Sequence, residues 1–126
     1  MDEEPLDREY LLSLSPQEVD ALPFGLITLD PDGVVTGYNK TESSLSGLDP
    51  RRVVGRNFFD EVAPCTRVKE FAGLYREMVA SGRTHSWEFN FLFRFARGEK
   101  RVHIRLAYFA FRRRGLIMVE DVTDAV

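Results

Sequence analysis

The sequence predicts an α+β fold, in which a five-stranded antiparallel sheet carries helices on one face and an N-terminal helical cap. Two strand-like runs lie near residues 24–39, and three more follow residue 85. The residues between these groups carry helical signals, so the order is strand, strand, short helices, a longer helix and three strands. The chain has 126 residues, 44% of them hydrophobic, which fits one domain with its own core.

Residues 1–22 are predicted to form an acidic helical cap on a domain formed by residues 23–126. "PLDREYLL" predicts a weak helix. "SPQEVDAL" predicts a stronger one, because Ser15 can act as N-cap, Pro16 suits the first turn and Glu18 completes a capping box. Arg8 is the one basic residue of this segment. Its acidic residues either dock on the basic residues between Arg97 and Arg114 or form a solvated face.

The first two strands are predicted as a hairpin, with "FGLITLD" and "VVTGYN" joined by the turn "PDG". Short helical pieces should follow between residues 40 and 60, interrupted at Gly47 and at Asp49-Pro50. An apolar stripe at helical spacing then predicts a helix over residues 69–80, ended by Ser81-Gly82. The stripe consists of Phe71, Leu74, Tyr75, Met78 and Val79.

Three strands complete the predicted sheet. "WEFNFLFRF" places five aromatic residues on one face, from Trp87 to Phe95. "RVHIRLAYF" alternates in the same way through Val102, Ile104 and Leu106, and "LIMVEDV" follows a polar turn.

Charge and composition exclude several classes of function. The net charge is −3 and the basic residues are dispersed, which argues against a nucleic-acid partner. No apolar run is long enough to cross a membrane, and the acidic first residues do not match the basic start of a signal peptide. We therefore expect a cytoplasmic protein without membrane or nucleic-acid partners.

Cys65 is the one cysteine of the chain and lies in "NFFDEVAPCT". Most lone cysteines are small buried apolar residues, whereas a reactive thiol lies at a loop or cavity. Pro64 restricts the preceding backbone and fits such a loop. Neither His85 nor His103 has a spacing that forms a metal site with Cys65, and no Asn or Asp completes a cysteine-hydrolase triad. We expect no metal site and no enzyme activity.

Several segments together resemble the photoactive yellow protein family of PAS domains: "LPFGLITLDPDGVVTGYN", Glu42, "SGLDP" and "VVGRNFFDEVAPCT". The resemblance has no gap from Leu22 to Phe71 and extends more loosely to His103. It implies a PAS fold and a blue-light photoreceptor. In this family the cysteine, here Cys65, carries p-coumaric acid (4-hydroxycinnamic acid) as a thioester.

The same resemblance implies that Tyr38 and Glu42 donate hydrogen bonds to the phenolate of this chromophore and that Ser46 orients the tyrosine. A phenol has a pKa near 10, so a buried phenolate at neutral pH requires strong hydrogen bonds. Glu42 can donate only when burial raises its pKa and keeps it protonated. Without the resemblance, Glu42 would be interpreted as a surface carboxylate, Tyr38 as a strand end and Ser46 as a helix cap.

Phe58, Phe59 and Phe91 match aromatic residues that surround the chromophore in the family, although an aromatic stripe is also typical of a plain core. Two residues depart from the familiar pattern. Leu48 stands where an arginine covers the phenolate end, and Phe95 aligns where a methionine assists thermal return of the chromophore. Attachment and hydrogen bonding should survive both departures, because neither residue forms the thioester or donates to the phenolate. The expected effect is on the speed of recovery.

The predicted function is light sensing by trans–cis isomerisation. Glu42 is expected to pass its proton to the chromophore, which leaves a buried carboxylate and partly unfolds the domain, most easily at the acidic cap. The output would be a conformational change that a downstream signalling protein or output domain reads. The alternative is a PAS domain that senses a non-covalent small ligand, or redox state through Cys65.

Overall fold

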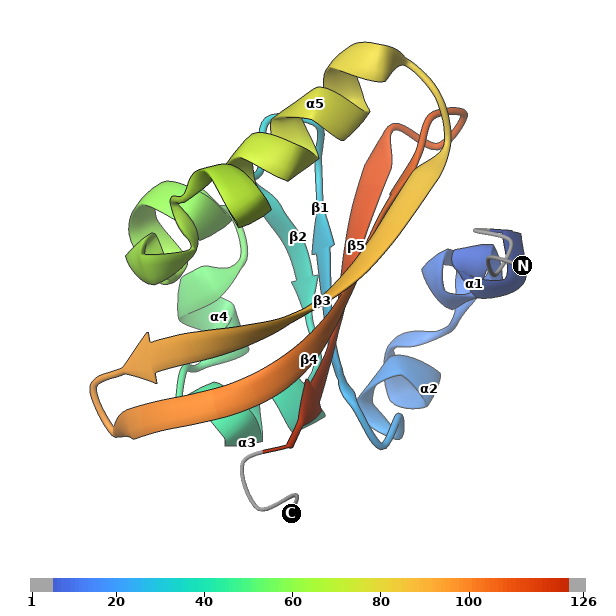
Figure 1. The fold of residues 1–126 in the computed structure, drawn as a ribbon. Coiled ribbons are helices and arrows are strands. Elements are labelled where there is room, and N and C mark those ends of the chain that lie inside the picture. The colour runs from blue at the N-terminus through green and yellow to red at the C-terminus, as the bar shows by residue number, and fades with distance from the viewer. Residues whose placement is uncertain (1–5, 123–126) are drawn as a thin grey trace.

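The computed structural model describes residues 6–122, and it confirms the predicted α+β fold with a five-stranded antiparallel sheet (Figure 1). The strand order is β2-β1-β5-β4-β3, so the first hairpin and the last meet where β1 pairs with β5. The strands are β1 (Gly25–Leu29), β2 (Val35–Tyr38), β3 (His85–Phe95), β4 (Gly98–Phe109) and β5 (Arg114–Asp121).

Helical segments between β2 and β3 cover one face of the sheet (Figure 1). Both predicted interruptions are confirmed: Gly47 ends the first helix with a φ of 79°, and Asp49 caps the next, in which Pro50 occupies the first turn. The helix predicted over residues 69–80 begins instead as a π-helical turn and becomes α-helical at Leu74. The segments are α3 (Lys40–Ser46), α4 (Pro50–Val53), η2 (Phe58–Val62), η3 (Pro64–Thr66), η4 (Lys69–Gly73) and α5 (Leu74–Ser81).

The main core lies between this helical layer and the sheet, and aromatic rings fill much of it. Phe71 and Tyr75 of the predicted stripe are buried, and they contact the ring of Phe59. The aromatic face of β3 reaches this core only in part, because β3 is an edge strand. Phe93 is buried, whereas Trp87 has 58% of its surface exposed.

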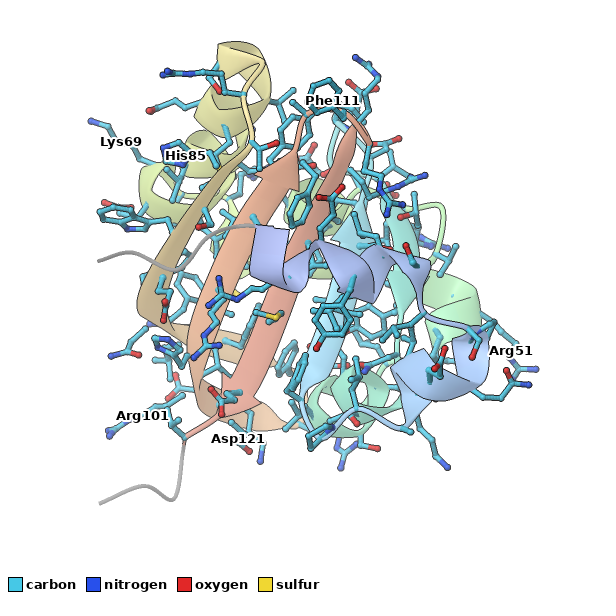
Figure 2. All side chains as sticks on the ribbon, turned by 90° about the vertical axis from the view of Figure 1, so that its right-hand side faces the viewer. Arg51, Lys69, His85, Arg101, Phe111 and Asp121 are labelled. Atoms are coloured by element: carbon cyan, nitrogen blue, oxygen red, sulfur yellow. The ribbon has the colours of Figure 1, made fainter. Side chains whose placement is uncertain are left out.

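The N-terminal segment forms a cap on the opposite face of the sheet, as Figures 1 and 2 show. It contains α1 (Leu6–Glu9), η1 (Tyr10–Ser13) and α2 (Pro16–Asp20). The capping box is confirmed, since Glu18 N donates to Ser15 Oγ at 3.2 Å and Ser15 N donates to Glu18 Oε1 at 2.8 Å. No helix among the described residues is long and apolar enough to cross a membrane.

A second apolar core holds the cap against the sheet, and ionic contacts add to it. Glu9 Oε2 lies 3.2 Å from Arg112 Nε, which gives one of the acidic-to-basic contacts considered from the sequence. A second ion pair has its charges the other way round, since Arg8 of the cap is the basic partner. Its Nη2 lies 3.9 Å from Oε2 of Glu88 in β3. Asp2, Glu3 and Glu4 lie outside the described residues. The buried members of the second core are Leu11, Leu26, Ala107, Phe109, Leu116 and Met118.

Ser15→Ala should loosen the cap by about 1 kcal/mol, because the helix loses its side-chain N-cap. Amide hydrogen exchange of residues 16–20 measures this loss. Ser44→Ala is a suitable control, because Ser44 is an exposed residue of α3, outside the cap. Equal loss of protection in both variants would mean that the capping box does not hold the cap.

Candidate functional site

Tyr38, Glu42 and Ser46 form one buried polar cluster on the helical side of the sheet. Tyr38 ends β2, and α3 begins immediately afterwards, so Glu42 and Ser46 lie one helical turn apart on the same side of α3. The Tyr38 hydroxyl lies 2.9 Å from Ser46 Oγ and 3.5 Å from Glu42 Oε2. Ser46 Oγ also accepts a hydrogen bond from Leu48 N at 3.1 Å. Tyr38, Glu42 and Ser46, which the resemblance groups in one site, therefore lie next to one another.

Glu42 is almost fully buried, with 1% of its surface exposed. Burial raises the pKa of its carboxyl from the usual 4.5 to about 8, and the hydrogen bond from Tyr38 opposes this only in part. The pKa of Tyr38 is also raised, first by burial and then by the charge of Glu42. Glu42 therefore holds its proton at neutral pH. Its Oε1 atom is buried and has no hydrogen-bond partner among the described residues.

Gly25 makes room for this carboxyl, a role that the sequence did not reveal. A Cβ at Gly25 would collide with Glu42 Oε1 and would lie 3.2 Å from Glu42 Cβ. The first residue of β1 must therefore be glycine for Glu42 to occupy its present place. This contact joins two distant segments, so no local pattern could predict it.

Asn39 fixes the start of α3, and it is a second residue that the sequence analysis missed. Its Oδ1 accepts hydrogen bonds from Glu42 N and Leu26 N, each at 2.9 Å. Its Nδ2 donates to Val19 O of the cap at 2.9 Å and to Phe24 O at 3.1 Å. One buried side chain thus connects the helix that carries Glu42 with both β1 and the cap.

Two more hydrogen bonds strengthen the connection between α3 and the cap region. Lys40 N donates to Asp20 Oδ1 at 2.9 Å, and Thr41 Oγ1 donates to Leu22 O at 2.7 Å. Any shift of the first turn of α3 must therefore disturb the C-terminal part of the cap.

Cys65 lies in the short 3-10 turn η3 and is partly exposed. Its side chain packs against the main core, the same core that contains Tyr38. Pro64 begins the turn and is exposed, so it shapes the backbone beside the cysteine. Thr66 ends the turn and is buried, with its hydroxyl donating to Ala63 O at 2.6 Å. The thiol is therefore at a loop that borders the core, the setting expected for a reactive cysteine.

The aromatic residues predicted around the site belong to the same core. Phe58 and Phe59 are buried and meet edge to face, with ring centroids 5.3 Å apart. Phe91 is partly buried. Phe95 is also partly buried, and it stacks on Phe93 at 5.2 Å with an interplanar angle of 16°. Leu48, which the resemblance aligns with an arginine of the family, packs against this core as well.

Arg97 lies over the end of α3, a position that could not be predicted from the sequence. A Cβ on Gly47 would lie 2.5 Å from Arg97 Cδ and 2.6 Å from its Nη1. Arg97 belongs to the turn between β3 and β4, so this hairpin reaches the residue that follows Ser46. A positive charge therefore lies one residue from Leu48, brought there from a distant part of the chain.

The described residues contain no group of three or more His, Cys, Asp or Glu side chains that could hold a metal ion. His103 instead lies between Asn90 Oδ1 and Glu88 Oε1, at 2.9 and 2.8 Å, on the cap side of the sheet. On the helical side of the sheet, the candidate reactive groups are the Glu42 carboxyl, the Tyr38 hydroxyl and the Cys65 thiol described above.

Comparisons with known proteins show the family to which this fold belongs. A family model described as "PAS fold" matches residues 19–126. The photoactive yellow protein of Halochromatium salexigens is 40% identical over 98 residues, which are 77% of this chain and 78% of that protein. The one from Rhodothalassium salexigens is 40% identical over 91 residues, covering 71% and 73%.

Among solved structures, the photoactive yellow protein domain of the sensor histidine kinase Ppr from Rhodospirillum centenum superposes with a TM-score of 0.84. It is 44% identical, and the match covers 90% of this chain and 98% of that domain. The sequence relatives and this structure cover most of the chain, including the polar cluster and Cys65. The chain belongs to the photoactive yellow protein family of PAS domains.

Proposed function

We propose that the chain is a blue-light photoreceptor that carries p-coumaric acid as a thioester on Cys65. The observation that supports this most strongly is the buried Glu42 carboxyl, whose Oε1 atom lacks a hydrogen-bond partner among the described residues. Leaving a buried polar group unsatisfied costs about 1–3 kcal/mol, so such an atom calls for a specific explanation. The phenol oxygen of a bound ligand would supply the missing partner.

The residues fit this group chemically. The Cys65 thiolate would attack the carbonyl carbon of an activated p-coumaroyl donor, form the C–S bond and expel the activating group. Glu42, protonated at neutral pH, and Tyr38 would donate hydrogen bonds to the phenol oxygen in its ionised form. Ser46 would hold the Tyr38 hydroxyl in place. When bound, the group supplies a light-absorbing double bond that isomerises.

After the light-driven isomerisation, the first step on this chain's own residues would be proton transfer from Glu42. The raised pKa makes Glu42 a competent proton donor near neutral pH, once its hydrogen-bond partner becomes more basic or moves. The carboxylate that remains would be buried beside Tyr38 without a positive partner, an unfavourable state in a region of low dielectric. The first turn of α3 would move to relieve it.

This movement would reach the cap through Asn39, Lys40 and Thr41, which bond to residues 19–24. The cap is a separate layer with its own small core, so it can loosen while the sheet stays paired. We infer that partial unfolding at the cap is the output. Because the structural relative is a domain of a sensor histidine kinase, a comparable signalling protein or domain is the proposed reader.

Reconstitution tests the proposal. Apo-protein mixed in the dark with an activated ester of p-coumaric acid should become yellow, and the mass of the peptide that contains Cys65 should increase. The added mass should survive denaturation, because a thioester is covalent. Colour without an added mass that survives denaturation would support the non-covalent alternative, and absence of colour would refute the photoreceptor proposal.

Phe95→Met should speed the return of the light-induced state to the dark state. The stack of Phe95 on Phe93 holds one rigid ring orientation, whereas methionine is flexible and polarisable. Aromatic pairs contribute about 0.5–1.5 kcal/mol, so roughly a two- to tenfold change in rate is expected. Flash photolysis at one pH and salt concentration measures it.

Leu92→Met is the matched control, because Leu92 lies on the same strand and projects to the other face of the sheet. Equal acceleration in both variants, or slower recovery in Phe95→Met, would mean that Phe95 does not control the return.

A further inference from the structure

The turn between β4 and β5, together with the first residue of β5 (residues 110–114), has an unusual combination of side chains on its surface. Phe111 is fully exposed, and Arg112, Arg113 and Arg114 follow it directly. Figure 2 shows Phe111 at the rim of the sheet, above the cap. Aromatic residues and arginine are enriched at the energetic centres of protein interfaces, and here they lie together. We call residues 110–114 the basic tip.

The basic tip is a defined turn. Arg112 N donates to Phe109 O at 3.1 Å, and Arg113 N donates to Ala110 O at 3.2 Å. Thr84, at the start of β3, accepts a hydrogen bond from Ala110 N at 3.2 Å. Arg113 has a φ of 49°, the left-handed conformation that closes such turns. The backbone of the turn is therefore ordered before any partner arrives, which reduces the entropy lost on binding.

The cap already shows which chemistry the basic tip accepts. Glu9 Oε2 lies 3.2 Å from Arg112 Nε, and Arg112 Nη2 donates to Ser13 Oγ at 2.9 Å. A carboxylate and a hydroxyl from a helical segment thus engage one of the three arginines. Arg113 and the ring of Phe111 remain exposed beside this contact.

We propose that the basic tip is a docking site for an acidic, helical or extended segment of a partner protein, with an apolar pocket that receives Phe111. The cap occupies the Arg112 part of this site, and its departure frees Arg112 to bind the partner beside Arg113 and Phe111. Docking at the tip is independent of the photochemistry. Its increase in the light rests on the proposed photoreceptor function.

A membrane surface is a poorer fit for the same residues. Stable attachment to a bilayer needs a broad apolar face, whereas the tip offers one aromatic ring. The chain as a whole carries a net charge of −3, which an anionic membrane repels. A protein partner with acidic groups placed around one pocket matches the small size of the tip.

The test uses the full chain in the dark and, as a probe, a twelve-residue synthetic peptide of Asp, Glu, Leu and Phe. Phe111→Ser and Arg113→Asp should each weaken peptide binding about tenfold or more, as expected for interface centres. Aspartate suits position 113 because it tolerates positive φ. Arg76→Asp is the matched control, with the same charge change at an exposed position on α5. Equal weakening by Arg76→Asp would show binding by net charge and would overturn the proposal.

Glu9→Gln tests the covering role of the cap, since it removes the carboxylate from Arg112. Peptide binding in the dark should become several times tighter, and no change would overturn the covering role. Phosphatidylserine vesicles form a second arm: vesicle binding that needs Phe111, with no peptide binding, would overturn the protein-docking proposal in favour of a membrane. If Glu9→Gln tightens binding while light does not, the docking site stands and the proposed release of the cap by light fails, whereas reconstitution separately decides the photoreceptor function.

Discussion

Cys65→Ala is expected to fold and to remain colourless after treatment with activated p-coumarate, with no covalent mass increase. The reason is that the chain has no second cysteine, so no other thiol can form the thioester. The cost in stability should be modest, about 1 kcal/mol, because Cys65 is only partly buried and leaves a small gap. Absorption spectra and intact mass before and after treatment measure the result.

Cys65→Ser provides the control for size and polarity. Serine keeps the shape of the side chain, but its hydroxyl is a weak nucleophile without an adjacent base, so acylation should still fail. A yellow Cys65→Ala protein with the same added mass would place the attachment on another residue and would end the thioester hypothesis. Loss of folding in both variants would appear in circular dichroism, which separates that result from a failure of attachment.

Glu42→Gln should remove a pH dependence of stability from the apo-protein. The folded-state pKa of Glu42, about 8, lies above the usual 4.5, so the folded state binds more protons between these values. Glu42 therefore contributes its full stabilisation below about pH 4.5, and this contribution is lost as the pH rises toward 8. The slope approaches about 1.4 kcal/mol per pH unit across this window. Urea unfolding at several pH values from 5 to 8 measures it.

In the reconstituted protein, the same substitution should move the dark-state absorption to longer wavelength. An amide donates a weaker hydrogen bond than a carboxylic acid, so the ground-state phenolate would be less stabilised than the excited state.

Glu77→Gln is the matched control for the pH dependence of stability, because Glu77 is an exposed carboxylate on α5. An unaltered pH slope in Glu42→Gln, or the same loss of slope in Glu77→Gln, would contradict the role given to the buried carboxyl.

Features that depend on neighbours in the sequence could be predicted with good accuracy. Ser15 and Glu18 form their capping box within one turn, and Gly47 ends α3 because its own φ is positive. Tyr38, Glu42 and Ser46 are also close in sequence, and the register of the family was sufficient to group them. Whether Cys65, Leu48 and Phe95 play the roles that the resemblance implies stays a prediction.

Contacts between distant segments could not be predicted in the same way. Gly25 and Arg97 shape the two ends of the polar cluster from β1 and from the β3–β4 turn, and neither belongs to a motif. The apolar run "LIMV" predicts a strand but does not indicate what covers each of its faces. Residues 116–119 are all buried because the helices cover one side and the cap the other. A continuous apolar run fits this two-sided burial.

The contact between Glu9 and Arg112 joins residues 103 positions apart, nearly the whole length of the chain. Contacts of high sequence separation form slowly, because a long loop must close before the contact stabilises anything. The surface that receives the cap is built from β1, β4 and β5, and two of these strands come last in the chain. During folding we therefore expect the cap to dock after the C-terminal hairpin has formed, so that Arg112 stays uncovered until the sheet is paired.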